Sequence, residues 1–166
     1  MQSLAQRLDG QIFDLILVNA GVLGPKDQRA SNASCGDVGQ LFFTNSVAPI
    51  AVALALANQL RPQSGVLAFM SSRMGSVSNP DGTEMALYKA SKAALNSMVN
   101  SLISEWAGPP VTCLSLHPGW VRTDLGGAGG DIDVLTSTRG LIEQVERHTG
   151  RGGLHFIDYQ GERVAW

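Results

Sequence analysis

The sequence is poor in charge, cysteine and aromatic residues, and it lacks a long hydrophobic run. Charged residues make up 16% of the 166 positions and the formal net charge is −2, so no basic surface for nucleic acid or anionic lipid is expected. The longest apolar stretch reaches only from Val47 to Ala57 and includes Pro49, whereas roughly 20 apolar residues are needed to cross a bilayer. We therefore expect no transmembrane segment and no nucleic-acid partner.

Only two cysteines are present, Cys35 and Cys113, and they form no metal-binding or redox motif. Two reduced thiols are typical of a cytoplasmic protein. The first residues also lack the basic start, apolar middle and small-residue cleavage site of a signal peptide. The sequence thus predicts a cytoplasmic protein without a metal centre.

Short apolar runs alternate with longer amphipathic segments, and neither an internal repeat nor a linker divides the chain. The apolar runs predict buried parallel strands at residues 14–18, 66–70, 111–116 and 155–159. Helical periodicity covers 2–8, 38–60, 85–106 and 136–148, while the polar segment 22–37 predicts a loop. This alternation predicts an α/β fold with a doubly wound parallel sheet of about four strands. We expect residues 1–166 to form one domain.

Polar residues follow three of the predicted strands, and binding sites in parallel sheets gather at such carboxyl ends. These positions are Asn19–Gly21, Ser71–Ser72 and Pro118–Gly119. Tyr88 and Lys92 stand four apart at the start of a predicted helix, so both side chains lie on one face. A lysine ammonium beside a phenol lowers the phenol pKa and yields a proton donor usable near neutrality. Taken alone, such a pair also arises often by chance.

Several other polar residues have alternative interpretations. Ser72 either faces the same crevice as Tyr88 or satisfies loop amides at a strand end. Asn45 is a poor helix former in an apolar segment, so it is either exposed or hydrogen-bonded across an irregular turn. His117 precedes Pro118 at a predicted strand end, where a structural histidine with satisfied hydrogen bonds is the commoner interpretation and a catalytic one the alternative. The segment Gly126–Gly130 follows the Pro118-Gly119 turn and does not lead from a strand directly into a helix. We therefore interpret it as a flexible loop on the substrate side rather than a phosphate site.

Together these motifs resemble the short-chain dehydrogenases/reductases, and the resemblance covers essentially the whole chain. It rests on Asn19-Ala20-Gly21, Asn45, Ser72, Tyr88-Lys-Ala-Ser-Lys92 and Pro118-Gly119-Trp-Val-Arg-Thr123, which occur in the order and approximate spacing of that family. Within the family the sequence is similar to the C-factor (C-signal) type. That similarity is carried by SRMGS at 72–76, HPGWV at 117–121, TDLGG at 123–127 and DYQG at 158–161.

The resemblance implies an oxidoreductase that uses NAD or NADP to move a hydride to or from a carbonyl or alcohol carbon. Tyr88 would be the acid/base, Ser72 would hold the substrate oxygen, and Lys92 would lower the Tyr88 pKa and bind the nicotinamide ribose. Asn45 would anchor a water in the proton relay. The remaining cofactor contacts implied are Asn19, Ala20 and Gly21 on the adenine-ribose side, with Pro118, Gly119, Val121 and Thr123 at the nicotinamide carboxamide.

The family's glycine-rich turn, which holds the cofactor pyrophosphate, has no counterpart before Asn19. We therefore expect an N-terminally truncated Rossmann-like domain in which strand 14–18 is a bare apolar edge. Helices 38–60 and 85–106 form a dimer face in many relatives, so the resemblance implies a homo-oligomer. Two alternatives to the oxidoreductase stay open: a C-factor-like signalling or protein-interaction role without catalysis, and a marginally stable fragment.

Overall fold

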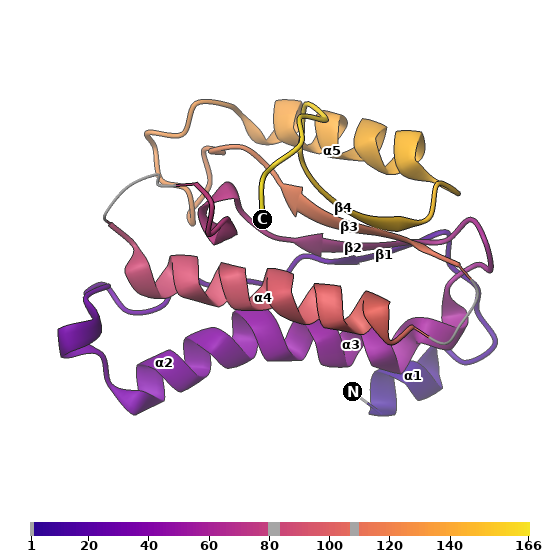
Figure 1. Cartoon of the computed structure of the whole chain (residues 1–166), viewed down its shortest axis with the longest axis horizontal. Coiled ribbons are helices and arrows are strands. Elements are labelled where there is room, and N and C mark those ends of the chain that lie inside the picture. The colour runs from indigo at the N-terminus through magenta and orange to yellow at the C-terminus, as the bar shows by residue number, and fades with distance from the viewer. Residues whose placement is uncertain (1, 80–83, 107–109) are drawn as a thin grey trace.

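The computed structural model describes residues 2–79, 84–106 and 110–166. Within them the chain forms a four-stranded parallel sheet whose strands lie side by side in chain order (Figure 1). The strands are Leu15–Val18 (β1), Val66–Met70 (β2), Thr112–His117 (β3) and Gly153–Asp158 (β4). The helices are Gln2–Arg7 (α1), Cys35–Phe42 (α2), Ala48–Leu56 (α3), Ala86–Ser104 (α4) and Val134–His148 (α5), with short turns at Ala30–Asn32 (η1), Phe43–Val47 (η2), Ala57–Gln59 (η3) and Arg73–Gly75 (η4).

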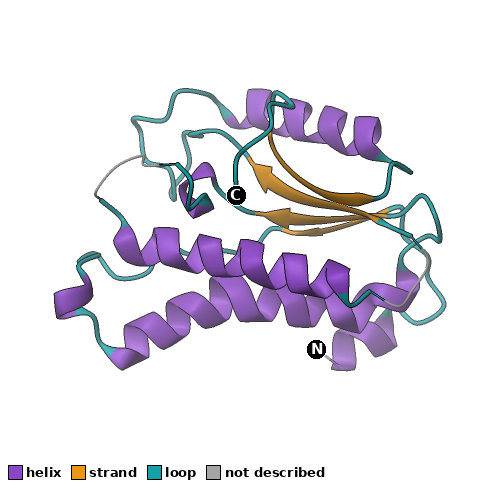
Figure 2. Ribbon diagram, viewed as in Figure 1, coloured by secondary structure: helices purple, strands orange, loops and turns teal. Residues whose placement is uncertain are grey.

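Helices cover both faces of the sheet, as Figure 2 shows. Side chains alternate along a strand, so each strand contributes to two cores. On β2, Leu67 and Phe69 pack toward α3 and α4, where Ile50, Leu95 and Val99 complete one buried cluster. Val66 and Ala68 point the other way, into a smaller cluster under α5. The predicted doubly wound α/β arrangement is therefore confirmed.

The predicted loop 22–37 is wrong at its end, because α2 begins at Cys35 and not at Val38. Ser34 is the N-cap, and its hydroxyl accepts a hydrogen bond from the Asp37 backbone N–H at 3.1 Å. An N-cap serine satisfies one of the free amides of the first helical turn. This contact stabilises a start that the two glycines of the segment obscure in the sequence.

The run from α2 to η3 is one helix, Cys35–Gln59, that is long and apolar enough by length and composition to cross a membrane. A helix from the core of a globular domain has the same properties. In this fold Leu41, Ile50 and Leu56 of that helix are buried against the rest of the domain. The helix therefore does not show a transmembrane segment.

Strand β1 is an edge of the sheet within the described residues, since it pairs with β2 alone. Ile16 is buried under α3, but Leu15 and Leu17 face the opposite side and are 39% and 44% exposed. No charged residue or proline interrupts the strand, although natural edge strands usually carry such residues to discourage pairing with other chains. The expected bare apolar edge is present.

Candidate active site

Tyr88 and Ser72 meet where β2 ends and α4 begins. Ser72 follows β2 and forms the N-cap of η4, with its hydroxyl oxygen accepting from the Met74 backbone N–H at 3.2 Å. The same serine side chain hydrogen-bonds the Tyr88 phenol. Ser72 thus does both things that the sequence left as alternatives: it caps a loop turn and it faces Tyr88.

Lys92 lies one helical turn after Tyr88, and its amine stands 5.9 Å from the centroid of the Tyr88 ring. The amine donates a hydrogen bond to the Met70 carbonyl oxygen at the end of β2, at 2.8 Å. Burial lowers the pKa of Lys92 to about 8. One backbone bond leaves two of its three N–H donors for other groups in the site.

The expected lowering of the Tyr88 pKa is not found. Burial raises the pKa of Tyr88, and the Ser72 hydrogen bond lowers it by less. The physical reason is position: the Lys92 amine lies beside the aromatic ring and is held by the Met70 carbonyl. Desolvation of the phenolate is therefore the largest influence on the Tyr88 pKa.

Asn45 sits in the π-helical turn η2 and is completely buried. The π turn confirms the irregular turn that was one of its two interpretations. Such turns occur mostly as single bulges inside α-helices and are frequent at functional sites. Its side-chain oxygen accepts from the Val22 N–H at 2.8 Å, and its amide nitrogen donates to the Val22 carbonyl at 2.8 Å. A further bond, 3.0 Å long, runs from that nitrogen to the Ser91 hydroxyl. The side chain thus joins the loop after β1 to α4.

Two cavities meet at Tyr88. The first, of about 520 Å³, is lined by Ser72 and Tyr88 together with largely apolar residues and is called the Trp120 cavity below. Its other defining residues are Leu23, Met74, Met85, His117 and Trp120. The second, of about 460 Å³, is called the Lys92 cavity and is lined by Asn19, Ala20, Gly21, Tyr88, Lys92, Pro118, Val121 and Thr123. The structure therefore brings together every predicted cofactor contact except Gly119.

Gly119 lines the Trp120 cavity instead. Its φ is +83°, and a Cβ there would come within 2.7 Å of Ile132 Cδ1 and 2.9 Å of the Tyr159 ring. Only glycine fits both the backbone conformation and the space. The residue thus shapes the turn after β3 from the side away from Lys92.

The glycine-rich segment 126–130 belongs to a loop folded on itself beside the Trp120 cavity. The Trp120 indole N–H donates to the Gly126 carbonyl at 2.7 Å, and the Arg122 guanidinium donates to the Gly130 carbonyl at 2.9 Å. Leu125 and Gly126 line the cavity. The start of the segment thus lies in the wall of the Trp120 cavity, and two side-chain hydrogen bonds hold its backbone.

His117 is half-buried at the end of β3, and its buried Nδ1 has no hydrogen-bond partner within the described residues. Burial and the nearby Arg73 lower the pKa of His117 to about 4, against a smaller opposing effect of Asp158. Its imidazole is therefore neutral at pH 7. The neutral ring lies in the wall of the Trp120 cavity, and its unpartnered Nδ1 differs from the satisfied structural histidine favoured from the sequence.

Sequence reasoning missed two polar side chains that hold Tyr88. The Gln28 side chain accepts from the Tyr88 backbone N–H, and the Ser91 hydroxyl donates to the Tyr88 carbonyl. Ser91 stands three positions after Tyr88, a helical spacing that could have indicated it. Gln28 lies in a distant loop, and nothing in its neighbourhood signals the contact.

Comparisons with known proteins identify the class. The family model described as short chain dehydrogenase matches residues 1–134, which include Tyr88, Lys92 and the strand ends around them. The chain belongs to the short-chain dehydrogenase family, and the fold is Rossmann-like. It is of the C-factor type: C-signal of Myxococcus xanthus is 36% identical over 174 aligned residues that cover the whole of both chains.

Solved structures agree in fold. A protein from Burkholderia multivorans assigned to the short-chain dehydrogenases/reductases, with bound NADP, superposes with a TM-score of 0.94 at 36% identity. A carbonyl reductase from Pseudomonas aeruginosa in complex with NADP gives 0.90 at 39% identity. Each alignment covers 99% of this chain and 71% of the other. An uncharacterized oxidoreductase of Mycobacterium tuberculosis is 31% identical, and 56% of its length is matched.

Proposed function

We propose that this protein is an NAD(P)-dependent oxidoreductase that interconverts a carbonyl compound and its alcohol, with Tyr88 as the acid/base. One observation carries the proposal: the Tyr88 phenol, hydrogen-bonded to Ser72, lies where the Trp120 and Lys92 cavities meet. A proton donor at such a junction can serve a substrate in one cavity and a cofactor in the other. Similarity to NADP-bound carbonyl reductases supports this assignment.

The Lys92 cavity fits the nicotinamide-ribose end of such a cofactor. A Cβ at Gly21 would lie 3.3 Å from the Lys92 amine and 3.5 Å from the Asn45 side-chain oxygen, so the absent side chain leaves room beside both groups. Lys92 has free donors for ribose hydroxyls. Pro118, Val121 and Thr123 would lie along the nicotinamide. Within the described residues no glycine-rich turn leads from a strand into a helix, so the fit concerns this end alone.

The chain's own residues would handle the proton. In the reductive direction the Ser72 hydroxyl donates a hydrogen bond to the carbonyl oxygen and holds it beside the Tyr88 phenol. A bound nicotinamide supplies the hydride to the carbonyl carbon. As negative charge grows on the oxygen, Tyr88 transfers its phenolic proton to it, which leaves an alcohol and a phenolate. The ammonium of Lys92, 5.9 Å from the ring, stabilises that phenolate until solvent returns a proton.

The test measures binding and turnover separately. Calorimetric and fluorescence titrations of NADPH would give the affinity, and NADPH oxidation with a panel of aromatic aldehydes and ketones would give turnover. Tyr88→Phe should lower turnover by at least about 100-fold, while the NADPH dissociation constant stays within about twofold. Lys92→Met should weaken NADPH binding, whereas Lys26→Met, on an exposed loop residue, should not. Full turnover by Tyr88→Phe would refute the role assigned to Tyr88.

The C-factor-like signalling or interaction role without catalysis is not favoured. A scaffold that had lost its chemistry would not need Ser72, Tyr88 and Lys92 to converge on two open cavities. The same Tyr88→Phe variant separates the two roles, because a signalling surface would be indifferent to one buried hydroxyl. We place the protein in the cytoplasm as a single domain with free thiols at Cys35 and Cys113.

We also propose that the protein is a homo-oligomer. The outer sides of α3 and α4 enclose a groove of about 830 Å³ whose apolar lining includes Ile50, Leu54, Met98 and Leu102. Leu54 is 58% exposed at its rim. Contiguous apolar surface of this kind is typical of contacts between protein chains. The occupant proposed is the same pair of helices from a second copy.

A further inference from the structure

Within the described part of the chain, the N-cap residue of α4 provides no side-chain cap for the first turn of the helix. Met85 occupies the N-cap position in the left-handed conformation, with φ of 65°, and its side chain makes no capping bond. The first amides of a helix have no partner within the helix. The amide of Tyr88 is one of them, and it donates to the Gln28 side-chain oxygen at 2.9 Å. A residue sixty positions earlier in the chain thus caps the helix at the proposed acid/base.

The same side chain holds the loop after β1. The Gln28 amide nitrogen donates to the carbonyl oxygens of Leu23 and Pro25, at 3.1 and 2.6 Å. With one acceptor bond and two donor bonds, its amide group has only one remaining lone pair. Leu23 lines the Trp120 cavity. Gln28 therefore connects a wall of that cavity to the backbone of Tyr88.

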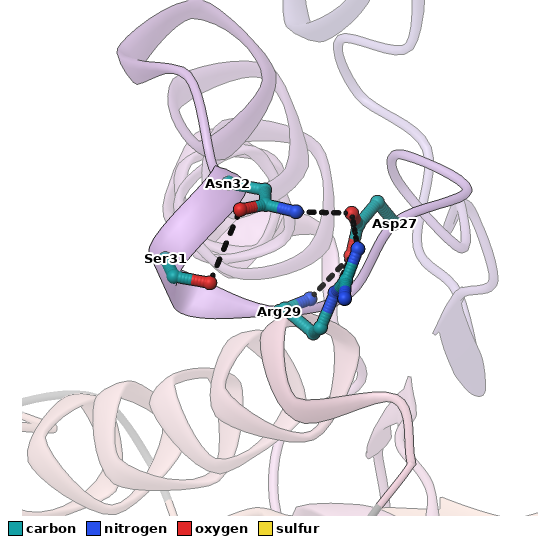
Figure 3. Close-up of polar contacts among 4 residues, drawn as sticks. All are labelled: Asp27, Arg29, Ser31 and Asn32. Carbon is teal, nitrogen blue, oxygen red and sulfur yellow. Dashed lines mark hydrogen bonds and ion pairs between the residues drawn. The ribbon is translucent and has the colours of Figure 1, made fainter.

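The residues on either side of Gln28, Asp27 and Arg29, are bonded to each other, and Asp27 is also bonded to Asn32, as Figure 3 shows. One Asp27 carboxylate oxygen accepts from the Arg29 backbone N–H at 3.0 Å and from its guanidinium at 2.9 Å. The other oxygen accepts from Asn32 at 2.7 Å. These contacts hold the pKa of Asp27 well below its usual range. A turn closed around Gln28 in this way limits the directions that its side chain can take.

The carbonyl of Tyr88 is held as well. It accepts from the Ser91 hydroxyl at 2.7 Å, and Ser91 in turn accepts from the Asn45 amide. Asn45 bonds both backbone groups of Val22, the residue before Leu23. A closed ring of bonds thus runs from Tyr88 through Gln28, the 22–25 backbone, Asn45 and Ser91 back to Tyr88.

We propose that Gln28 is a positioning residue that fixes the Tyr88 backbone against the Leu23 wall of the Trp120 cavity. The proposal rests on the proposed function for its catalytic consequence. The two groups of the Gln28 side chain have separate roles: its oxygen holds the Tyr88 amide, and its nitrogen holds the 22–25 loop. Loss of the oxygen contact should slow proton transfer, and loss of the nitrogen contacts should weaken substrate binding.

Two substitutions separate the halves. Gln28→Met removes every contact, so kcat should fall about threefold to tenfold and the KM of the carbonyl substrate should rise. Gln28→Glu keeps an acceptor for the Tyr88 amide but places a carboxylate against the Leu23 and Pro25 carbonyls. Its kcat should stay within about twofold of the parent, while KM rises by a similar factor to that of Gln28→Met. Gln6→Met, on an exposed side chain of α1, is the matched control.

Hydrogen exchange at the Tyr88 amide gives a readout that does not depend on turnover. Gln28→Met should accelerate that exchange about tenfold, Gln28→Glu should not, and the amides of Ala68 and Leu114 in the sheet should be unchanged in both. Unaltered Tyr88 exchange in Gln28→Met would overturn the proposal. Accelerated exchange with an unchanged kcat would overturn its catalytic part. If the parent protein turns over no carbonyl compound, the proposed function fails, and the exchange data alone decide whether Gln28 holds Tyr88.

Discussion

Gly75 packs so closely on Lys92 that a Cβ at Gly75 would come within 2.8 Å of the Lys92 carbonyl carbon and 2.9 Å of its oxygen. Gly75 ends η4, the turn that Ser72 caps. The close approach brings Ser72 within reach of α4, and with it the Tyr88 phenol. Backbone-to-backbone contact of this kind permits no side chain, and a rigid helix cannot yield to one.

Gly75→Ala should therefore disrupt the site from outside the cavities. We expect a loss of about 1–3 kcal/mol in unfolding free energy from overpacking, measured by urea denaturation. NADPH-dependent turnover should fall as Ser72 moves away from Tyr88. Gly39→Ala is the control: it is also helical, a Cβ there meets nothing within 4 Å, and it should be neutral or stabilising. Equal behaviour of the two variants would contradict the prediction.

Because the pKa of Lys92 is about 8, the free energy of unfolding should vary with pH in the alkaline range. The ordinary value is 10.5, so between pH 8 and 10 the unfolded chain keeps a proton that the folded chain has released. Unfolding free energy should therefore rise with pH across this window, by on the order of 2 kcal/mol relative to Lys92→Met. Denaturation curves of both proteins at pH 8, 9 and 10 measure the difference. Parallel pH profiles would show that the amine is not desolvated.

The lowered pKa of His117 predicts a pH dependence of the same sign in the acid range. Its pKa is lowered from 6.5 to about 4, so below pH 6.5 the unfolded chain takes up a proton that the folded chain resists. Unfolding free energy should fall between pH 6.5 and pH 4, by about 2 kcal/mol more than in His117→Gln. Arg73 and Asp158, the charged residues acting on the ring, are unchanged in the variant and cancel in the comparison. A difference that does not vary with pH would place the imidazole in contact with water.

An arginine placed at the rim of the groove between α3 and α4 should weaken the association of one copy of the protein with another. Light scattering of the parent protein should give a multiple of 17.6 kDa, and Leu54→Arg should reduce it toward that value. An arginine at the rim would have to be desolvated for a second copy to dock. Ile142→Arg places the same charge on α5, where Ile142 is 59% exposed, and should leave the mass unchanged. A parent protein that is monomeric at all concentrations would refute the proposed oligomer.

The order of elements was readable from the sequence because buried parallel strands are short continuous apolar runs. The runs at 14–18, 66–70, 111–116 and 155–159 became β1 to β4 with small changes at their ends. The start of α2 was missed because Gly36 and Gly39 are unfavourable in helices, although Ser34 caps the segment and stabilises its helical start. A cap supplied by a distant residue, as Gln28 supplies one to α4, produces no local sequence pattern. It can be recognised only from the folded structure.

The positions of the candidate site residues were predicted better than the directions of their pKa shifts. Spacing placed Tyr88 and Lys92 on one helix face, and strand ends placed Ser72 and Pro118 nearby. The direction of the Tyr88 pKa could not be read in this way, because it depends on how much water the fold removes from the phenol. The same holds for His117, whose lowered pKa comes mainly from burial.

The strand order of the sheet, identical to the order of the chain, has a consequence for how the protein is made. During synthesis β1 emerges before β2, the strand with which it pairs among the described residues, and the helical stretch Cys35–Gln59 lies between them. Every pairing in the sheet closes a long loop, which slows folding and prolongs exposure of apolar segments. The segment Leu15–Val18 of the nascent chain therefore stays without its β2 partner while the intervening residues are made, which exposes an apolar segment during synthesis.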